Sequence, residues 1–139
     1  MRLPIQVQSI IFKKVNNSFE FLLLKRIPKK GEFWQPVTGG LEDGESLEET
    51  SIREIKEETG IENIKQLIKD VHFYQFKEFN SLSKENKETG MTEYVFGVEV
   101  DVNTKVTIDK NIYPEHSEFK WCSFEEALEL LKWDSNKKH

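Results

Sequence analysis

The segment from Gly39 to Ile61 constrains this chain most, because it joins a glycine-rich stretch to a helix with several acidic side chains on one turn. We expect it to open as a loop, since glycines permit close backbone approaches that other residues resist. Ser46, followed three residues later by Glu49, has the pattern of a capping box, which predicts that the helix begins there. Gly60 is a natural stop at the other end.

Three glutamates of the predicted helix, Glu54, Glu57 and Glu58, are three and four residues apart. Residues at that spacing are neighbours on one helix face, so their like charges repel. We therefore expect a positive partner, and a hard divalent cation fits best, because Mg²⁺ is usually held by a few carboxylates together with substrate phosphates. The alternative, a solvated helix face, suits Glu48 and Glu49 better than it suits these three.

The spacing of the whole segment resembles the Nudix box. From Gly39 through Glu45 to the run Arg53–Ile61, every fixed position of that motif is filled. The chain is thus similar to the Nudix hydrolases. This resemblance implies an α+β Nudix fold, in which a mixed β-sheet is sandwiched between helices (α/β/α), as one domain over 1–139. It also implies hydrolysis of a phosphoanhydride bond with Mg²⁺, or Mn²⁺ in its place, as cofactor.

The same resemblance assigns roles to individual residues. Arg53 would orient a carboxylate, and Glu45 would support the loop and the helix start, or act through another metal. Glu115 would add to the metal site from outside the box, the alternative being a carboxylate exposed at the rim. Which carboxylate takes the proton from the attacking water stays open. The expected metal ligands are Glu54, Glu57, Glu58, Glu115 and, through a backbone carbonyl, Gly39.

Substrate choice is expected to lie outside the box. Trp34 and Gln35 fit a contact in which one side chain stacks on a ring and the other bonds its edge, although large aromatic residues also serve as packing. Arg26 belongs to a basic stretch that either meets substrate phosphates or is a solvated loop. The run from Trp34 to Gly39 also resembles the segment before the box in dihydroneopterin triphosphate and dATP pyrophosphohydrolases.

Other segments predict the remaining elements. His116 is interpreted as a hydrogen-bonding loop residue, and Cys122 as a small buried apolar residue. Leu47, Ile52 and Ile55 are expected to hold the acidic helix against the core. The expected elements are a hairpin of Ile5–Phe12 with Phe19–Leu24, a β-rich segment Val71–Phe79, a mobile loop Asn80–Gly90, a strand Thr92–Val102, a short strand through Trp121 and an amphipathic helix Phe124–Trp133.

Composition narrows the partners. The net charge of −5 argues against a broadly basic surface for nucleic acid or membrane, and no stretch approaches the length of a membrane span. We expect a cytoplasmic enzyme, as a monomer or homodimer, that cleaves a (deoxy)nucleoside or pterin triphosphate to monophosphate and pyrophosphate. The alternatives are dinucleoside polyphosphates, oxidised nucleotides, RNA 5′ ends, or a non-catalytic nucleotide-binding module.

Overall fold

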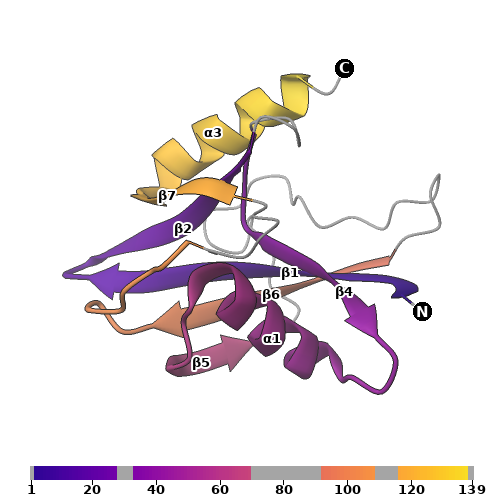
Figure 1. Ribbon diagram of the computed structural model, residues 1–139. Helices are drawn as coiled ribbons and strands as arrows, with labels where there is room; N and C mark the ends of the chain where they lie inside the picture. Colours follow the sequence, from indigo (N-terminus) through magenta and orange to yellow (C-terminus); the bar gives the residue numbers. More distant parts are fainter. Residues whose placement is uncertain (1, 28–32, 70–91, 109–115, 138–139) are drawn as a thin grey trace.

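A computed structural model of the chain describes residues 2–27, 33–69, 92–108 and 116–137. In this part a mixed sheet lies between two helices (Figure 1). The strands are β1 (Arg2–Val15), β2 (Ser18–Arg26), β3 (Trp34–Gln35), β4 (Val37–Glu42), β5 (Ile64–Ile68), β6 (Thr92–Val100) and β7 (His116–Cys122), and the helices are α1 (Leu47–Thr59) and α3 (Phe124–Lys137). No helix in these ranges is long and apolar enough to cross a membrane.

Strand β1 is the centre of the sheet, because it pairs with three other strands. It runs antiparallel to β2 and β4 and parallel to β6. The main path is β3-β2-β1-β6-β5, while β4 branches from β1 and β7 from β2. The expected mixed sheet and the expected hairpin of the first two strands are both confirmed.

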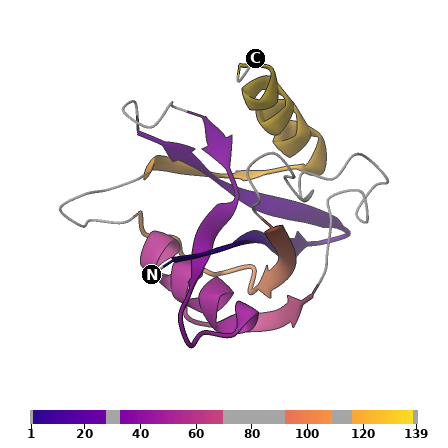
Figure 2. The ribbon, with the colours of Figure 1, turned by 90° about the vertical axis from the view of Figure 1, so that its right-hand side faces the viewer.

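The two faces of the sheet carry separate apolar cores. Side chains alternate along a strand, so Val7 and Ile11 of β1 pack on the face covered by α1, and Ile10 and Phe12 pack on the face covered by α3. Figure 2 shows the strands between the two helices. The predicted α/β/α sandwich is therefore confirmed, and α1 is fixed on one side of it.

Several predicted boundaries differ from the observed ones. Gly39 and Gly40 do not open a loop: they lie inside β4, paired with Val7 and Gln6 of β1, and the turn comes later, where Gly44 has φ +85°. The strand predicted to end at Val102 ends at Val100. Strand β5 was not predicted. The segments Val71–Phe79 and Asn80–Gly90 lie outside the described residues.

Helix α1 begins and ends as predicted. The Ser46 hydroxyl accepts from the Glu49 amide, the Glu49 carboxylate accepts from the Ser46 amide, and Gly60 closes the helix in the left-handed region. Of the three expected apolar contacts, Ile55 is fully buried and Leu47 packs at the edge of the core, but Ile52 is 46% exposed. That expectation was wrong because the buried side of α1 includes polar groups: the Ser51 hydroxyl lies 2.6 Å from that of Ser9 in β1.

Substitution of each isoleucine by alanine should show that the two positions contribute differently to the free energy of unfolding. Ile55→Ala should lower the free energy of unfolding by about 2–5 kcal/mol, because it leaves a cavity under α1. Ile52→Ala, on the same helix, should cost less than about 1 kcal/mol, because much of the side chain is already in water. Urea unfolding followed by circular dichroism measures both, and equal losses would contradict this description of the helix.

Candidate active site

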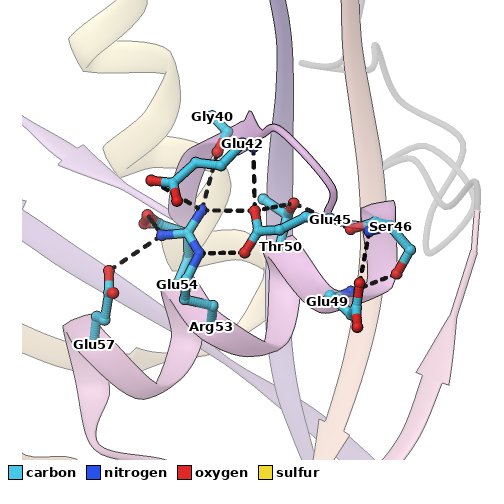
Figure 3. Close-up of polar contacts among 9 residues, drawn as sticks. All are labelled: Gly40, Glu42, Glu45, Ser46, Glu49, Thr50, Arg53, Glu54 and Glu57. Carbon is cyan, nitrogen blue, oxygen red and sulfur yellow. Dashed lines mark hydrogen bonds and ion pairs between the residues drawn. The ribbon is translucent and has the colours of Figure 1, made fainter. Parts of the chain in front are cut away.

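Arg53 is the centre of the polar cluster on α1. Its Nε donates to Oε2 of Glu45 at 2.6 Å and its Nη2 to Oε1 of the same carboxylate at 3.1 Å (Figure 3). Oε1 of Glu45 also accepts from the Thr50 hydroxyl at 2.9 Å and from the Glu42 amide at 3.2 Å. The hydrogen bonds from Arg53, Thr50 and the backbone lower the pKa of Glu45 to about 2, and Glu45 in turn raises the pKa of Arg53.

The other end of the Arg53 guanidinium reaches two of the glutamates singled out above. Nη1 lies 3.1 Å from Oε1 of Glu54 and 3.4 Å from Oε1 of Glu57, while Nη2 donates to the Gly40 carbonyl at 3.1 Å (Figure 3). The positive partner expected for the acidic face is thus supplied in part by the chain itself. These contacts also tie α1 to β4.

Glu54 is a buried carboxylate, with 8% of its surface exposed. Burial raises its pKa to about 7; Glu57 and Glu58 add to the rise, and Arg53 opposes it. Gly39 makes room for this carboxylate, because a Cβ at that position would lie 2.2 Å from Cγ and Cδ of Glu54. Any larger residue at position 39 would therefore have to displace the Glu54 carboxylate from its place beside Arg53.

Glu58 is buried as well, and one of its contacts comes from β7. Nδ1 of His116 lies 2.7 Å from Oε1 of Glu58, and Nε2 of the same ring lies 2.9 Å from Nε2 of Gln35. His116 is only 4% exposed. The prediction that it hydrogen-bonds is confirmed, but its placement in a loop was wrong, because it begins β7 and pairs with Arg26 of β2. Sequence reasoning did not assign it to the site, because both partners are distant along the chain.

Trp34 and Gln35 do not face the same side of the sheet. Trp34 packs against the core under α3, with Nζ of Lys25 5.9 Å from its ring centre. Gln35 points to the other face and reaches His116. Because neighbouring strand residues point to opposite faces, the two side chains are separated by the sheet. Arg26 is half-buried over the Phe33 ring, and its Nε lacks a hydrogen-bond partner in the described part of the chain.

The residues of α1 fit a hard cation by their chemistry. Their donors are carboxylate oxygens, which Mg²⁺ prefers, and Glu54 is a buried acid whose ionised form is disfavoured until a positive charge offsets it. Within the described ranges no three acidic or imidazole groups already surround one point: Glu54 is turned to Arg53 and Glu58 to His116. Glu115, the expected further ligand, lies outside those ranges.

Cys122 is fully buried at the end of β7, as predicted. Burial raises the pKa of its thiol to about 11. It packs in the core under α3, on the face of the sheet away from α1. Cys122 therefore takes no part in the acidic cluster.

Comparison with known proteins identifies what this arrangement resembles. A family model described as NUDIX domain matches residues 5–139. The chain is 29% identical to an RNA pyrophosphohydrolase of Pelagibacter ubique, covering 94% of this chain and 84% of that protein. It is 30% identical to the asymmetrical bis(5′-nucleosyl)-tetraphosphatase of Mus musculus (92% and 80%), and 26% identical to the dihydroneopterin triphosphate diphosphatase of Escherichia coli K12 (96% and 87%).

The fold agrees with these relationships. A crystal structure of a NUDIX hydrolase from Listeria monocytogenes superposes with a TM-score of 0.69 at 31% identity, covering 98% of this chain and 88% of the other. The mixed sheet between two helices is thus that of a solved relative.

Replacement of Arg53 by lysine tests the hydrogen-bonding role of the guanidinium. A lysine keeps the charge but not the fork that bonds Glu45 twice, so Arg53→Lys should lower the free energy of unfolding by about 1–3 kcal/mol. Lys56→Ala on the same helix should change it by less than about 0.5 kcal/mol, because its pair with Glu62 is exposed. Urea unfolding at low salt compares them, and a Lys variant as stable as the parent would contradict the role given to Arg53.

The raised pKa of Glu54 predicts a pH dependence of stability in the metal-free chain. Between about pH 4.5 and pH 7 the folded state keeps a proton that the unfolded state releases, so this residue makes stability fall as the pH rises. Glu54→Gln removes that dependence. With EDTA present, the variant should be more stable than the parent at pH 8, by on the order of 1–3 kcal/mol, and similar to it near pH 4.5. If the parent and Glu54→Gln show the same dependence of stability on pH, the raised pKa of Glu54 is contradicted.

Proposed function

The chain belongs to the NUDIX domain family and is a hydrolase of phosphoanhydride bonds, and on that premise we propose a substrate and a role for each site residue. The substrate is a (deoxy)nucleoside triphosphate or dihydroneopterin triphosphate, cleaved to the monophosphate and pyrophosphate. One observation carries the site assignment: the buried acid Glu54 lies on α1 beside two further acids, with its proton affinity raised. The E. coli relative supports the substrate class, since it covers almost the whole chain.

Glu54, Glu57 and Glu58 hold one or more Mg²⁺ ions in this proposal, with Mn²⁺ as a substitute, and Glu115 and the Gly39 carbonyl complete the ligand set. When bound, the cation offsets the charge of the phosphates and lowers the pKa of the attacking water. A carboxylate of the cluster takes the proton of that water as its oxygen attacks phosphorus. The bond from phosphorus to the bridging oxygen breaks, and pyrophosphate leaves.

Arg53 and Glu45 act by holding the acids in place. The two hydrogen bonds between them fix the guanidinium against the turn before α1, and the free end of the guanidinium then sets where Glu54 and Glu57 lie. Because Glu45 keeps its charge well below neutral pH, this support persists over the range in which the enzyme would work. Arg53 therefore positions the ligands without being one.

Arg26, Trp34 and Gln35 are the proposed substrate-side residues. Arg26 carries the positive charge that an anion would meet, and its Nε is a buried donor without a hydrogen-bond partner among the described residues. Trp34 and Gln35 lie on opposite faces of the sheet, so one ring cannot meet both side chains from the same side. Each of the three thus needs its own test.

A second candidate substrate is a dinucleoside tetraphosphate. The mouse relative named for that activity is 30% identical over most of both chains. Such a substrate carries the same phosphoanhydride bonds and would use the same acids. It differs from a nucleoside triphosphate by a second nucleoside, which must bind at the other end of the polyphosphate.

Neutral replacement of the acids tests the metal assignment. Glu57→Gln and Glu58→Gln should each lower Mg²⁺-dependent turnover at least about 100-fold, since even a change beside a metal ligand costs 10–100-fold. Glu62→Gln, an exposed acid just beyond the helix, should leave turnover within twofold. Unchanged rates in the first two variants would remove these residues from the metal site.

The substrate itself is identified by a panel assayed with Mg²⁺ and Mn²⁺, with products separated by anion exchange. It should contain the canonical and oxidised nucleoside triphosphates, dihydroneopterin triphosphate, diadenosine tetraphosphate and 5′-triphosphate RNA. We expect pyrophosphate from a triphosphate. Release of ATP and AMP from the dinucleotide would favour the second candidate. Tight binding with no turnover of any member would indicate a binding module.

A further inference from the structure

Three side chains from three separate elements form a continuous hydrogen-bonded chain under the acidic helix. Gln35 belongs to β3, His116 to β7 and Glu58 to α1. The imidazole lies between the other two, 2.9 Å from the amide nitrogen of Gln35 and 2.7 Å from Oε1 of Glu58. Strands β3 and β7 both pair with Leu24 and Lys25 of β2, so they flank β2, and the side chains of Gln35 and His116 meet across it.

The two ends favour one tautomer of the ring. As the Gln35 amide is oriented, its nitrogen faces Nε2 of His116 and donates to it. Nδ1 then donates to the Glu58 carboxylate. Each ring nitrogen thus has a matched partner, and the two contacts orient the imidazole.

We propose that His116 is a positioning residue that holds the carboxylate of Glu58 in its metal-binding orientation, and that Gln35 acts on the metal site through His116. The proposal rests on the assignment of Glu58 to the metal site made above. For Gln35 this role is the alternative to the substrate contact proposed above, and the kinetic test below separates the two.

Burial strengthens the hold of these hydrogen bonds on the Glu58 carboxylate. His116 and Glu58 are 4% and 6% exposed, so water offers little replacement for a lost contact. An acid that loses a buried donor is held in its orientation by one hydrogen bond fewer. Histidine or carboxylate partners that orient a metal ligand typically change affinity or activity by about 10–100-fold when removed. Removal of the Gln35 amide should also lower affinity or activity. It would act through His116, because Gln35 does not touch Glu58.

The ring state is tested first, without metal or substrate. In ¹⁵N-labelled protein, the His116 ring should show a protonated Nδ1 and an unprotonated Nε2, with the signal identified by its loss in His116→Asn. Gln35→Leu, which keeps the side-chain bulk but removes the donor, should shift the Nε2 resonance. A ring protonated at Nε2 alone, or no change in Gln35→Leu, would overturn the proposal.

Mn²⁺ binding to the substrate-free chain, measured by electron paramagnetic resonance, is the second test. His116→Ala should weaken binding about 10–100-fold. His116→Asn places an amide donor near the position of Nδ1 and should recover most of that loss. Gln35→Leu should weaken binding in the parent but have no further effect in the His116→Asn background. If the fold-changes in Mn²⁺ affinity caused by Gln35→Leu and His116→Asn multiply in the double variant, the two residues act independently. That result would overturn the link between Gln35 and His116.

Kinetics separate positioning from substrate contact. If Gln35 acts through His116, Gln35→Leu lowers kcat with KM changed less than about threefold, whereas loss of a substrate contact raises KM. Cys122→Ala is the matched control, since Cys122 is buried in the same strand as His116 but packs on the α3 side. It should lower the melting temperature while leaving Mn²⁺ affinity unchanged. If Cys122→Ala weakens Mn²⁺ binding as much as the His116 and Gln35 variants do, general destabilisation of β7 explains the losses. That result would overturn the proposal.

The two proposals fail in different ways. A parent chain that neither binds Mn²⁺ nor cleaves any phosphoanhydride would overturn the proposed function. A parent chain that does both, while Gln35→Leu leaves Mn²⁺ affinity and kcat unchanged, would overturn the role of Gln35 alone.

Discussion

The hydrogen bonds of Arg53 are the interaction on which the site depends. Acids at Glu45, Glu54 and Glu57 come close to one another because one guanidinium bonds all three and also the backbone of β4. Guanidinium suits this task because its donors lie in a rigid plane and it keeps its charge. The same contacts fix α1 to the strand before it, so the acidic turn and the glycine that admits Glu54 stay in register.

The sheet also holds α1 in a fixed position. Strand β1 is buried on both faces and pairs directly with β4, and α1 packs against both of these strands. The hydroxyl contact between Ser9 and Ser51 adds a polar link between the sheet and α1. Rigid mounting matters in a site made of like charges, because any movement that separates an acid from its partner leaves a buried charge unpaired.

Sequence patterns predicted best where partners are close along the chain. The capping box at Ser46, the end at Gly60 and the first hairpin depend on residues a few positions apart, and all were found. The loop predicted at Gly39 was wrong, because this glycine lies in β4, paired with Val7, although the expected close approach does occur there, by the Glu54 side chain of α1. Ile52 was misjudged because serine and buried acids occupy positions of α1 that apolar residues were expected to fill.

The sequence by itself determined the family and predicted the acids that we propose hold a metal, because both follow from residue types at fixed short spacings on one helix. Only the tertiary structure decided which groups hold those acids. His116 meets Glu58 across 58 positions and Gln35 across 81, a contact set by the pairing of β3 and β7 with β2. It also placed Trp34 and Gln35 on opposite faces of the sheet, since neighbouring residues diverge once a strand forms.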